Sequence, residues 1–133
     1  MKKIQCSIVF IFVLFFLTGC SRSGSKDFVV STIPIDGSTA DSTSNITVRF
    51  RYDMDPSTLN QQNIKIEEGK HSSDISDLFT YSYDQNSREL HIDFIFEGGG
   101  VGTGNSVAVT LSKAIKTIDN RSMSNVFVFS YST

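Results

Sequence analysis

Apolar and polar residues alternate with a period of two along much of the chain after residue 27. The clearest example is the segment 45–52, where one phase is apolar (Ile46, Val48, Phe50, Tyr52) and the other is polar (Thr47, Arg49, Arg51). Because successive side chains of a strand point to opposite faces, this pattern predicts a strand with one face toward a core and one toward water.

A second alternating region predicts a β-hairpin. Residues 79–83 and 89–96 flank the polar turn Asp84-Gln85-Asn86-Ser87. In the later strand, one apolar phase is formed by Leu90, Ile92, Phe94 and Phe96. Turn-forming residues between two alternating runs are typical of a hairpin.

Shorter apolar runs predict the remaining strands, at residues 28–35, 64–66, 107–111 and 126–131. Asp55 before Pro56 predicts one capped helical turn, and the glycine-rich segment 98–104 predicts a mobile loop between strands. Seven short strands without a long amphipathic helix predict an all-β fold, a sandwich of antiparallel strands. The core between the two sheets is expected to contain residues on the apolar phase of their strands, namely Val48, Phe50, Phe94, Val109 and Phe129.

The only long apolar run lies near the N-terminus, at residues 8–17 (IVFIFVLFFL). Lys2 and Lys3 precede it, and small residues close it, which is the layout of a secretory signal peptide. The closing quartet Leu17-Thr18-Gly19-Cys20 resembles a bacterial lipobox. A membrane-spanning helix is the weaker alternative, because the run is about half of the roughly 20 residues that a bilayer requires. A buried N-terminal strand or helix is a further alternative. It is disfavoured because ten consecutive large apolar residues are unusual for such an element at a chain terminus.

The lipobox resemblance implies that Cys20 receives a diacylglycerol thioether and that cleavage after Gly19 makes Cys20 the first mature residue. The chain then divides into a lipoprotein signal peptide (1–19), the lipidated cysteine with a flexible spacer (20–27), and one sandwich domain (28–133). Cys6 is lost with the signal, so the mature chain retains one acylated cysteine and no disulfide. Ser21 after that cysteine resembles a sorting signal for the outer membrane, which favours the outer membrane or cell surface within the cell envelope.

Charge excludes one class of partner. The chain has 12 basic and 14 acidic residues, a net charge of −2. Removing residues 1–19 takes away Lys2 and Lys3, which leaves 10 − 14 = −4. The remaining basic residues are scattered along the sequence without a basic stripe to neutralise phosphates, so we expect no nucleic-acid partner.

Three ordered motifs resemble the SbsA-type bacterial Ig-like domain: Val30–Gly37 (VSTIPIDG), the strand ITVRF, and Met54–Leu59 (MDPSTL). The resemblance covers residues 28–132 and implies an Ig-like β-sandwich of about seven strands, used as a repeat, spacer or binding module without catalytic residues. The family usually carries a K-D-x-x-G-N turn before its last strand. Here the turn reads Lys116-Thr117-Ile118-Asp119-Asn120-Arg121, and Asn120 can replace glycine at positive φ.

No catalytic motif is found. His71 lies in a polar loop, and His91 lies on the polar phase of its strand. Neither histidine has a partner spaced for a metal site, and no nucleophile motif is present. The glycines at 98–104 lack the Lys-Ser/Thr of a phosphate-binding loop and precede a strand instead of a helix. We therefore expect no enzyme activity and no cofactor beyond the covalent lipid.

Acidic residues offer one metal hypothesis. Asp53 and Asp55 flank a strand-to-turn corner, and Asp36 in the first turn could approach them, which would gather the oxygen ligands that calcium prefers. The simpler interpretation is that Asp55 caps a helical turn and Asp53 is solvated, which requires no metal.

Two functional classes remain open. One is a surface module that binds an envelope protein or glycan, and the other is a structural spacer or assembly subunit of an envelope complex. An exposed apolar or aromatic patch would favour the binding class.

Overall fold

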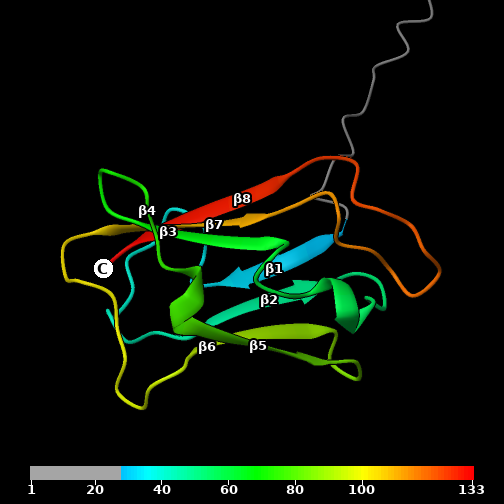
Figure 1. Cartoon of the computed structure of the whole chain (residues 1–133), viewed down its shortest axis with the longest axis horizontal. Helices are drawn as coiled ribbons and strands as arrows, with labels where there is room; N and C mark the ends of the chain where they lie inside the picture. Colours follow the sequence, from blue (N-terminus) through cyan, green and yellow to red (C-terminus); the bar gives the residue numbers. More distant parts are fainter. Residues whose placement is uncertain (1–27) are drawn as a thin grey trace, which may run out of the picture.

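A computed structural model describes residues 28–133, so the predicted signal peptide, Cys20 and the spacer lie outside the described residues. This part of the chain forms eight strands and two short 3-10 helices (Figure 1). The elements are β1 (Val29–Ile33), β2 (Ile46–Phe50), η2 (Pro56–Thr58), β3 (Ile64–Glu68), β4 (Ser73–Asp74), η3 (Ser76–Leu78), β5 (Phe79–Asp84), β6 (Glu89–Phe94), β7 (Ser106–Leu111) and β8 (Phe127–Ser132). Within residues 28–133, no helix has the length and apolar character needed to cross a membrane.

The strands form two sheets that pack face to face. The first has the order β1-β2-β6-β5 and the second the order β4-β3-β7-β8, and Figure 1 shows them as two layers. Neighbouring strands within each sheet are antiparallel. The predicted all-β sandwich is therefore confirmed. The additional strand, β4, is two residues long and pairs with Glu67 and Glu68 in a segment that was expected to be a loop.

The chain passes from the first sheet to the second directly after β1. The Ile33–Pro34 peptide bond is cis, and residues 37–40 then run parallel to the end of β8. Gly37 N donates to Ser130 O at 2.7 Å, and Ala40 N donates to Ser132 O at 2.9 Å. Gly37 has φ of 77°, a conformation that glycine adopts without steric cost. The segment covers part of the β8 edge, which would otherwise expose unpaired backbone groups.

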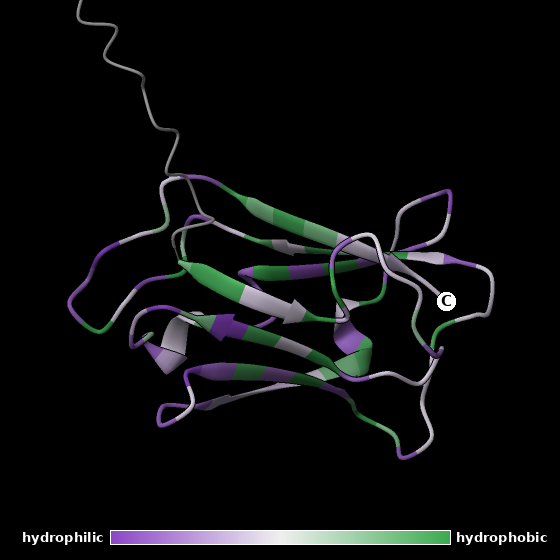
Figure 2. Cartoon of the chain, turned by 180° about the vertical axis from the view of Figure 1, so that it is seen from behind, coloured by the Kyte–Doolittle hydropathy of each residue, from purple (hydrophilic) through white to green (hydrophobic). Residues whose placement is uncertain are grey.

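The core lies between the two sheets, and Figure 2 shows hydrophobic and hydrophilic residues alternating along the strands that enclose it. Four of the five predicted core residues are at most 1% exposed, namely Val48, Phe50, Val109 and Phe129. Phe94 is only half-buried and lies at the margin, with its ring centroid 4.5 Å from that of Phe79. Buried residues also come from outside the strands, among them Met54, Ile115 and Met123. Residues 28–133 therefore contain a complete hydrophobic core.

Two predicted strands end earlier than the alternation suggests. The strand expected at 45–52 ends at Phe50, and Tyr52 instead packs edge-on against Phe28 at 5.3 Å between ring centroids. The strand expected at 89–96 ends at Phe94, and Phe96 is 69% exposed. Ile95 N still bonds to Leu78 O in the β5–β6 register, and the chain turns directly after it, where Gly98 has φ of 75° and Gly99 N donates to Phe96 O at 2.9 Å.

The sandwich has two ends with different contents. The entry end contains Phe28, where the described chain begins, and the loops 51–59, 84–88 and 112–126, which hydrogen-bond to one another. The distal end contains the loops 41–45, 69–73 and 95–105 and the C-terminal Thr133. Figure 1 shows these two groups of loops at opposite ends of the molecule.

Candidate functional site

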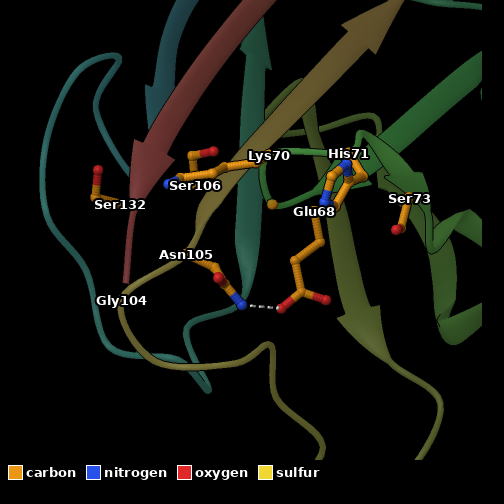
Figure 3. Close-up of a pocket in the computed structure, with 9 residues that line it drawn as sticks. Glu68, Lys70, His71, Ser73, Gly104, Asn105, Ser106 and Ser132 are labelled. Carbon is orange, nitrogen blue, oxygen red and sulfur yellow. Dashed lines mark hydrogen bonds between the residues drawn. The ribbon is translucent and has the colours of Figure 1, made fainter.

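A polar pocket of about 570 Å³ lies at the distal end. It is lined by residues from the β3–β4 loop, the start of β7 and the end of β8: Glu68, Gly69, Lys70, His71, Ser73, Gly104, Asn105, Ser106 and Ser132. Figure 3 shows these side chains around the opening, with Ser132 and Ser73 on opposite sides of the view. The lining therefore combines hydroxyls, an amide, an ammonium group and an imidazole, which supply both hydrogen-bond donors and acceptors.

Glu68 fixes one wall of the pocket. Its Oε1 accepts a hydrogen bond from Asn105 Nδ2 at 2.8 Å (Figure 3). The same oxygen accepts another from Gly102 N at 2.7 Å. Gly104 N donates to Thr133 O, and Thr133 Oγ1 donates to Gly102 O. The glycine-rich segment 98–104, expected to be a mobile loop, is thus tied at several points to β3 and to the end of β8.

The pocket retains free hydrogen-bonding capacity. Within residues 28–133, neither Lys70 nor His71 has an ion-pair partner, and both residues are exposed. Beneath the pocket, burial and then the charge of Glu68 raise the pKa of Tyr131 to about 12. The Tyr131 hydroxyl therefore stays protonated at neutral pH, and the groups available to a ligand are those of the pocket rim.

A second hollow, of about 300 Å³, borders the other side of the 95–105 loop. Its lining includes Thr43, Asn45, Asp93 and Glu97, and the exposed Phe96 ring forms an apolar surface beside them. Gly99 permits this arrangement, since a Cβ there would lie 2.8 Å from Phe94 Cβ. An exposed ring beside amide, hydroxyl and carboxylate groups can contact the apolar face of a ligand while the polar groups bind its hydroxyls.

The structure does not bring the three candidate calcium ligands together. Asp36 Oδ1 accepts from Ser130 N at 2.9 Å. Asp53 pairs with Arg88 Nε at 2.7 Å, and no group of three or more His, Cys, Asp or Glu side chains within residues 28–133 could hold a metal ion.

The predicted helix cap is confirmed. Asp55 precedes η2, and its carboxylate accepts from Ser57 N at 3.0 Å and from Ser57 Oγ at 2.7 Å. These hydrogen bonds, the one from the hydroxyl first, lower the pKa of Asp55.

The other sequence candidates take separate positions. His71 lines the distal pocket, whereas His91 lies on the outer face of the first sheet with Nδ1 3.4 Å from Thr47 Oγ1 and Nε2 3.8 Å from Glu89. Asn120 has φ of 66°, as expected for a residue replacing glycine in the turn before the last strand. The lipidation and cleavage residues Cys20 and Gly19 lie outside the described residues.

Sequence reasoning missed most of the pocket. Ser73, Asn105, Ser106 and Ser132 are small polar residues at strand ends, and their types give no signal in a serine-rich chain. Only the pairing of β3 with β7 and of β7 with β8 places them around one opening. Of the candidate features in the sequence, His71 and the glycine-rich segment 98–104 belong to this end.

Comparisons with known proteins agree on the fold. A sequence model of the family described as bacterial Ig-like domain matches residues 25–133. Among solved structures, the S-layer protein rSbsC(31-844) superposes with a TM-score of 0.55 at 15% identity, covering 79% of this chain and 13% of that one. The N-terminal part of the S-layer protein SbsC gives a TM-score of 0.53 at 17% identity, covering 78% of this chain and 23% of that one.

A smaller protein has the same fold. PcoC, a methionine-rich copper resistance protein from Escherichia coli, gives a TM-score of 0.53 at 12% identity, with 77% of this chain and 93% of that chain covered. The chain thus spans less than a quarter of the S-layer proteins and nearly the whole length of PcoC. A search of curated protein sequences gave no match.

Proposed function

Because the chain belongs to the bacterial Ig-like domain family, we propose that it is a non-catalytic lipoprotein of the bacterial cell envelope, anchored through Cys20, that binds a ligand with its distal end. The observation that carries this proposal is that the entry of the chain and the candidate binding site lie at opposite ends of the domain. The described chain begins at Phe28 in the entry end, and the polar pocket and the exposed Phe96 belong to the distal end. Figure 1 shows the loops of these two ends on opposite sides of the sandwich. A membrane anchor at one end leaves the opposite end accessible.

The chemistry of the distal end favours a glycan over an apolar ligand. Three serine hydroxyls, the Asn105 amide, and Lys70 and His71, which have no ion-pair partner within residues 28–133, can exchange hydrogen bonds with sugar hydroxyls. On the other side of the 95–105 loop, Phe96 offers a flat apolar surface for a sugar ring. Protein partners of the envelope are the alternative, and the experiment below separates the two.

Non-catalytic function is supported by the arrangement of the polar groups. Within residues 28–133, the hydroxyl that contacts a histidine is Thr47 Oγ1, 3.4 Å from His91 Nδ1 on the outer face of the first sheet. Neither residue lines the two distal hollows, so this hydroxyl–imidazole contact lies outside the proposed binding end. Ig-like sandwiches are common in cell-surface domains, where their end loops serve recognition.

The decisive experiment places a photo-crosslinking amino acid at Thr103 in the distal loop, with the same amino acid at Ser124 in the entry end as the matched control. Both positions are exposed. Illumination of native envelopes is expected to give an adduct from Thr103 that periodate destroys, since periodate cleaves sugar diols. A periodate-resistant, protease-sensitive adduct would identify a protein partner. Equal adducts from both positions, or none from Thr103, would refute distal binding.

A structural role in an envelope assembly is the second candidate. It is favoured by the S-layer likeness, in which the chain matches 13% or 23% of much longer proteins as one unit of several. Exposed aliphatic residues near β1 and β8 would suit contacts between such units: Val30, Ile33, Ile35 and Val128. If the assembly role holds, substituting Ile35 and Val128 with serine should change the size of detergent-extracted complexes, whereas Phe96→Ala should not.

A further inference from the structure

Basic residues gather at the entry end of the domain, although they are scattered in the sequence. Residues 28–133 contain eight Lys and Arg residues. Six belong to the entry end or to the adjacent end of β2, and we call them the entry-end basic cluster: Arg49, Arg51, Arg88, Lys113, Lys116 and Arg121.

The remaining charges make the domain strongly polarised. Five acidic residues share the entry end or the adjacent strand ends, which gives 6 − 5 = +1: Asp53, Asp55, Asp84, Glu89 and Asp119. The rest of residues 28–133 carries two basic and eight acidic residues, which gives 2 − 8 = −6. A domain with this charge distribution orients in the field of an anionic surface, with its entry end toward that surface.

Two guanidinium groups of the cluster, those of Arg88 and Arg121, are held in place by neighbouring side chains. Arg88 Nε bonds to Asp53 Oδ1 at 2.7 Å, and Arg88 Nη1 bonds to Arg51 O at 3.0 Å. Arg121 lies 4.4 Å from the centroid of the Tyr52 ring and bonds to Asp119 through Nε at 3.0 Å. Such contacts limit the rotamers of Arg88 and Arg121, while both side chains remain about half exposed.

Arg49 and Arg51 have no ion-pair partner within residues 28–133. Glu89 lies opposite Arg49 in the β2–β6 register, but its carboxylate lies 3.8 Å from His91. Two open hollows, of about 700 and 310 Å³, meet at Arg51 and Arg88. The free donors therefore face a shallow, exposed surface and not an enclosed site.

Exposed aliphatic side chains accompany these donors. Ile118 is 60% exposed and lines the smaller hollow beside Arg121, and Val30 is 54% exposed and lines the larger one beside Arg49. Basic residues next to exposed aliphatic residues are typical of surfaces that dock on the headgroup layer of a membrane. A soluble polyanion such as nucleic acid would contact the basic residues but would leave the exposed aliphatic residues without an apolar partner.

We propose that the entry-end basic cluster docks the domain on the anionic phosphate headgroups of the membrane that carries the lipid anchor. The inference rests on the proposed anchor at Cys20 for its geometry. Seven residues lie between Cys20 and Phe28, so eight residue-to-residue steps give a reach of at most about 29 Å, and of about 16 Å as the average span of a flexible chain. Anchoring makes the headgroup contact intramolecular, so a weak affinity suffices. Docking would hold the distal end away from the membrane.

The test uses residues 21–133, which contain the complete core and lack Cys20, so binding cannot depend on acylation. Co-sedimentation is measured with vesicles of phosphatidylglycerol and phosphatidylcholine, and with vesicles of phosphatidylcholine alone. We expect binding only to the anionic vesicles and release by salt. Arg49→Gln/Arg51→Gln should weaken binding about 25-fold, about fivefold for each basic residue removed.

The matched control is Lys65→Gln/Lys70→Gln, which makes the same change in net charge with the two basic residues outside the cluster. It should alter binding by less than about twofold if position and not net charge matters. Equal losses in the two double variants, or equal binding to neutral vesicles, would overturn the proposal. The proposal would also be overturned if inorganic phosphate, at the concentration of lipid phosphate in the assay, released the protein from the vesicles. That result would indicate a site for free phosphate. None of these outcomes bears on acylation of Cys20 or on crosslinking at Thr103.

Discussion

Phe50→Ala removes a large side chain from the centre of the sandwich. Phe50 is 1% exposed, and its ring packs edge-on against that of Tyr83 with centroids 6.4 Å apart. Truncation of a buried phenylalanine costs about 3–5 kcal/mol, because apolar contacts are lost and the cavity closes only partly. A domain of this size has about 5–15 kcal/mol of unfolding free energy, so the variant should be close to the limit of folding.

The domain supplies a matched control with the same chemical change. Phe96→Ala also replaces phenylalanine with alanine, but Phe96 is 69% exposed, and the loss should stay within about 0.5 kcal/mol. Arg49→Ala, one residue from Phe50 on the solvent face of β2, should likewise cost little. Urea unfolding of residues 21–133, followed by circular dichroism, measures all three.

The expected order of stability is clear-cut. Phe96→Ala and Arg49→Ala should unfold near the wild-type midpoint, while the midpoint of Phe50→Ala should fall steeply or the variant should be unfolded in water. Similar losses for Phe50→Ala and Arg49→Ala would show that the register of β2 is wrong. Similar losses for Phe50→Ala and Phe96→Ala would refute the placement of Phe96 outside the core.

Three further predictions concern titration and metal. The hydroxyl of Ser76, then its backbone N–H, lowers the pKa of Asp74; the resulting stability is present above about pH 4 and lost as pH falls through the lowered pKa, so Asp74→Asn should reduce the acid sensitivity of the urea midpoint. Burial raises the pKa of Tyr81 and Tyr131 to about 12; their contribution is complete below about pH 10 and lost as pH rises toward 12, so tyrosinate absorbance should appear there together with unfolding. Calcium should leave the melting temperature unchanged relative to chelator, whereas saturation of a real site at a hundred times its Kd would add about 2.7 kcal/mol; an upward shift abolished by Asp53→Asn would contradict this.

The strands that could be predicted are those whose side chains alternate between core and water. β2 and β6 are examples, since Val48, Phe50, Leu90 and Ile92 all lie on the apolar phase and are buried. Alternation fails at strand ends, where it continues in the sequence to Phe96 although the backbone has already turned. A periodicity of two reports the possible faces of a strand and not its last residue.

Part of the core could not be predicted because it comes from loops. Met54 and Ile115 are fully buried, and Met123 is 2% exposed, yet none of them lies in a strand. Asp55 N bonds to Lys116 O and Met123 N bonds to Ile115 O, so these loops close the entry end of the sandwich. The signal for such contacts lies in tertiary pairing, which a single sequence does not contain.

Surface clusters have the same origin. Arg51 and Arg88 are far apart in the sequence, but the β2–β6 pairing and the bond between Arg88 Nη1 and Arg51 O make them neighbours. The basic residues are scattered along the sequence, which excludes a linear basic motif. It does not exclude a cluster that forms when the strands pair. The distal pocket is assembled in the same way from three strand ends.

The most direct test of the account is the mass of the mature protein isolated from the membrane fraction, for the wild type and for Cys20→Ala. The account predicts a wild-type chain that begins at Cys20 and carries a diacylglyceryl group, and a Cys20→Ala chain that carries no lipid and no longer partitions into detergent. A wild-type chain that begins at Met1 without lipid, or a Cys20→Ala chain that still labels with fatty acid, would contradict the lipid anchor and the orientation of the domain that depends on it.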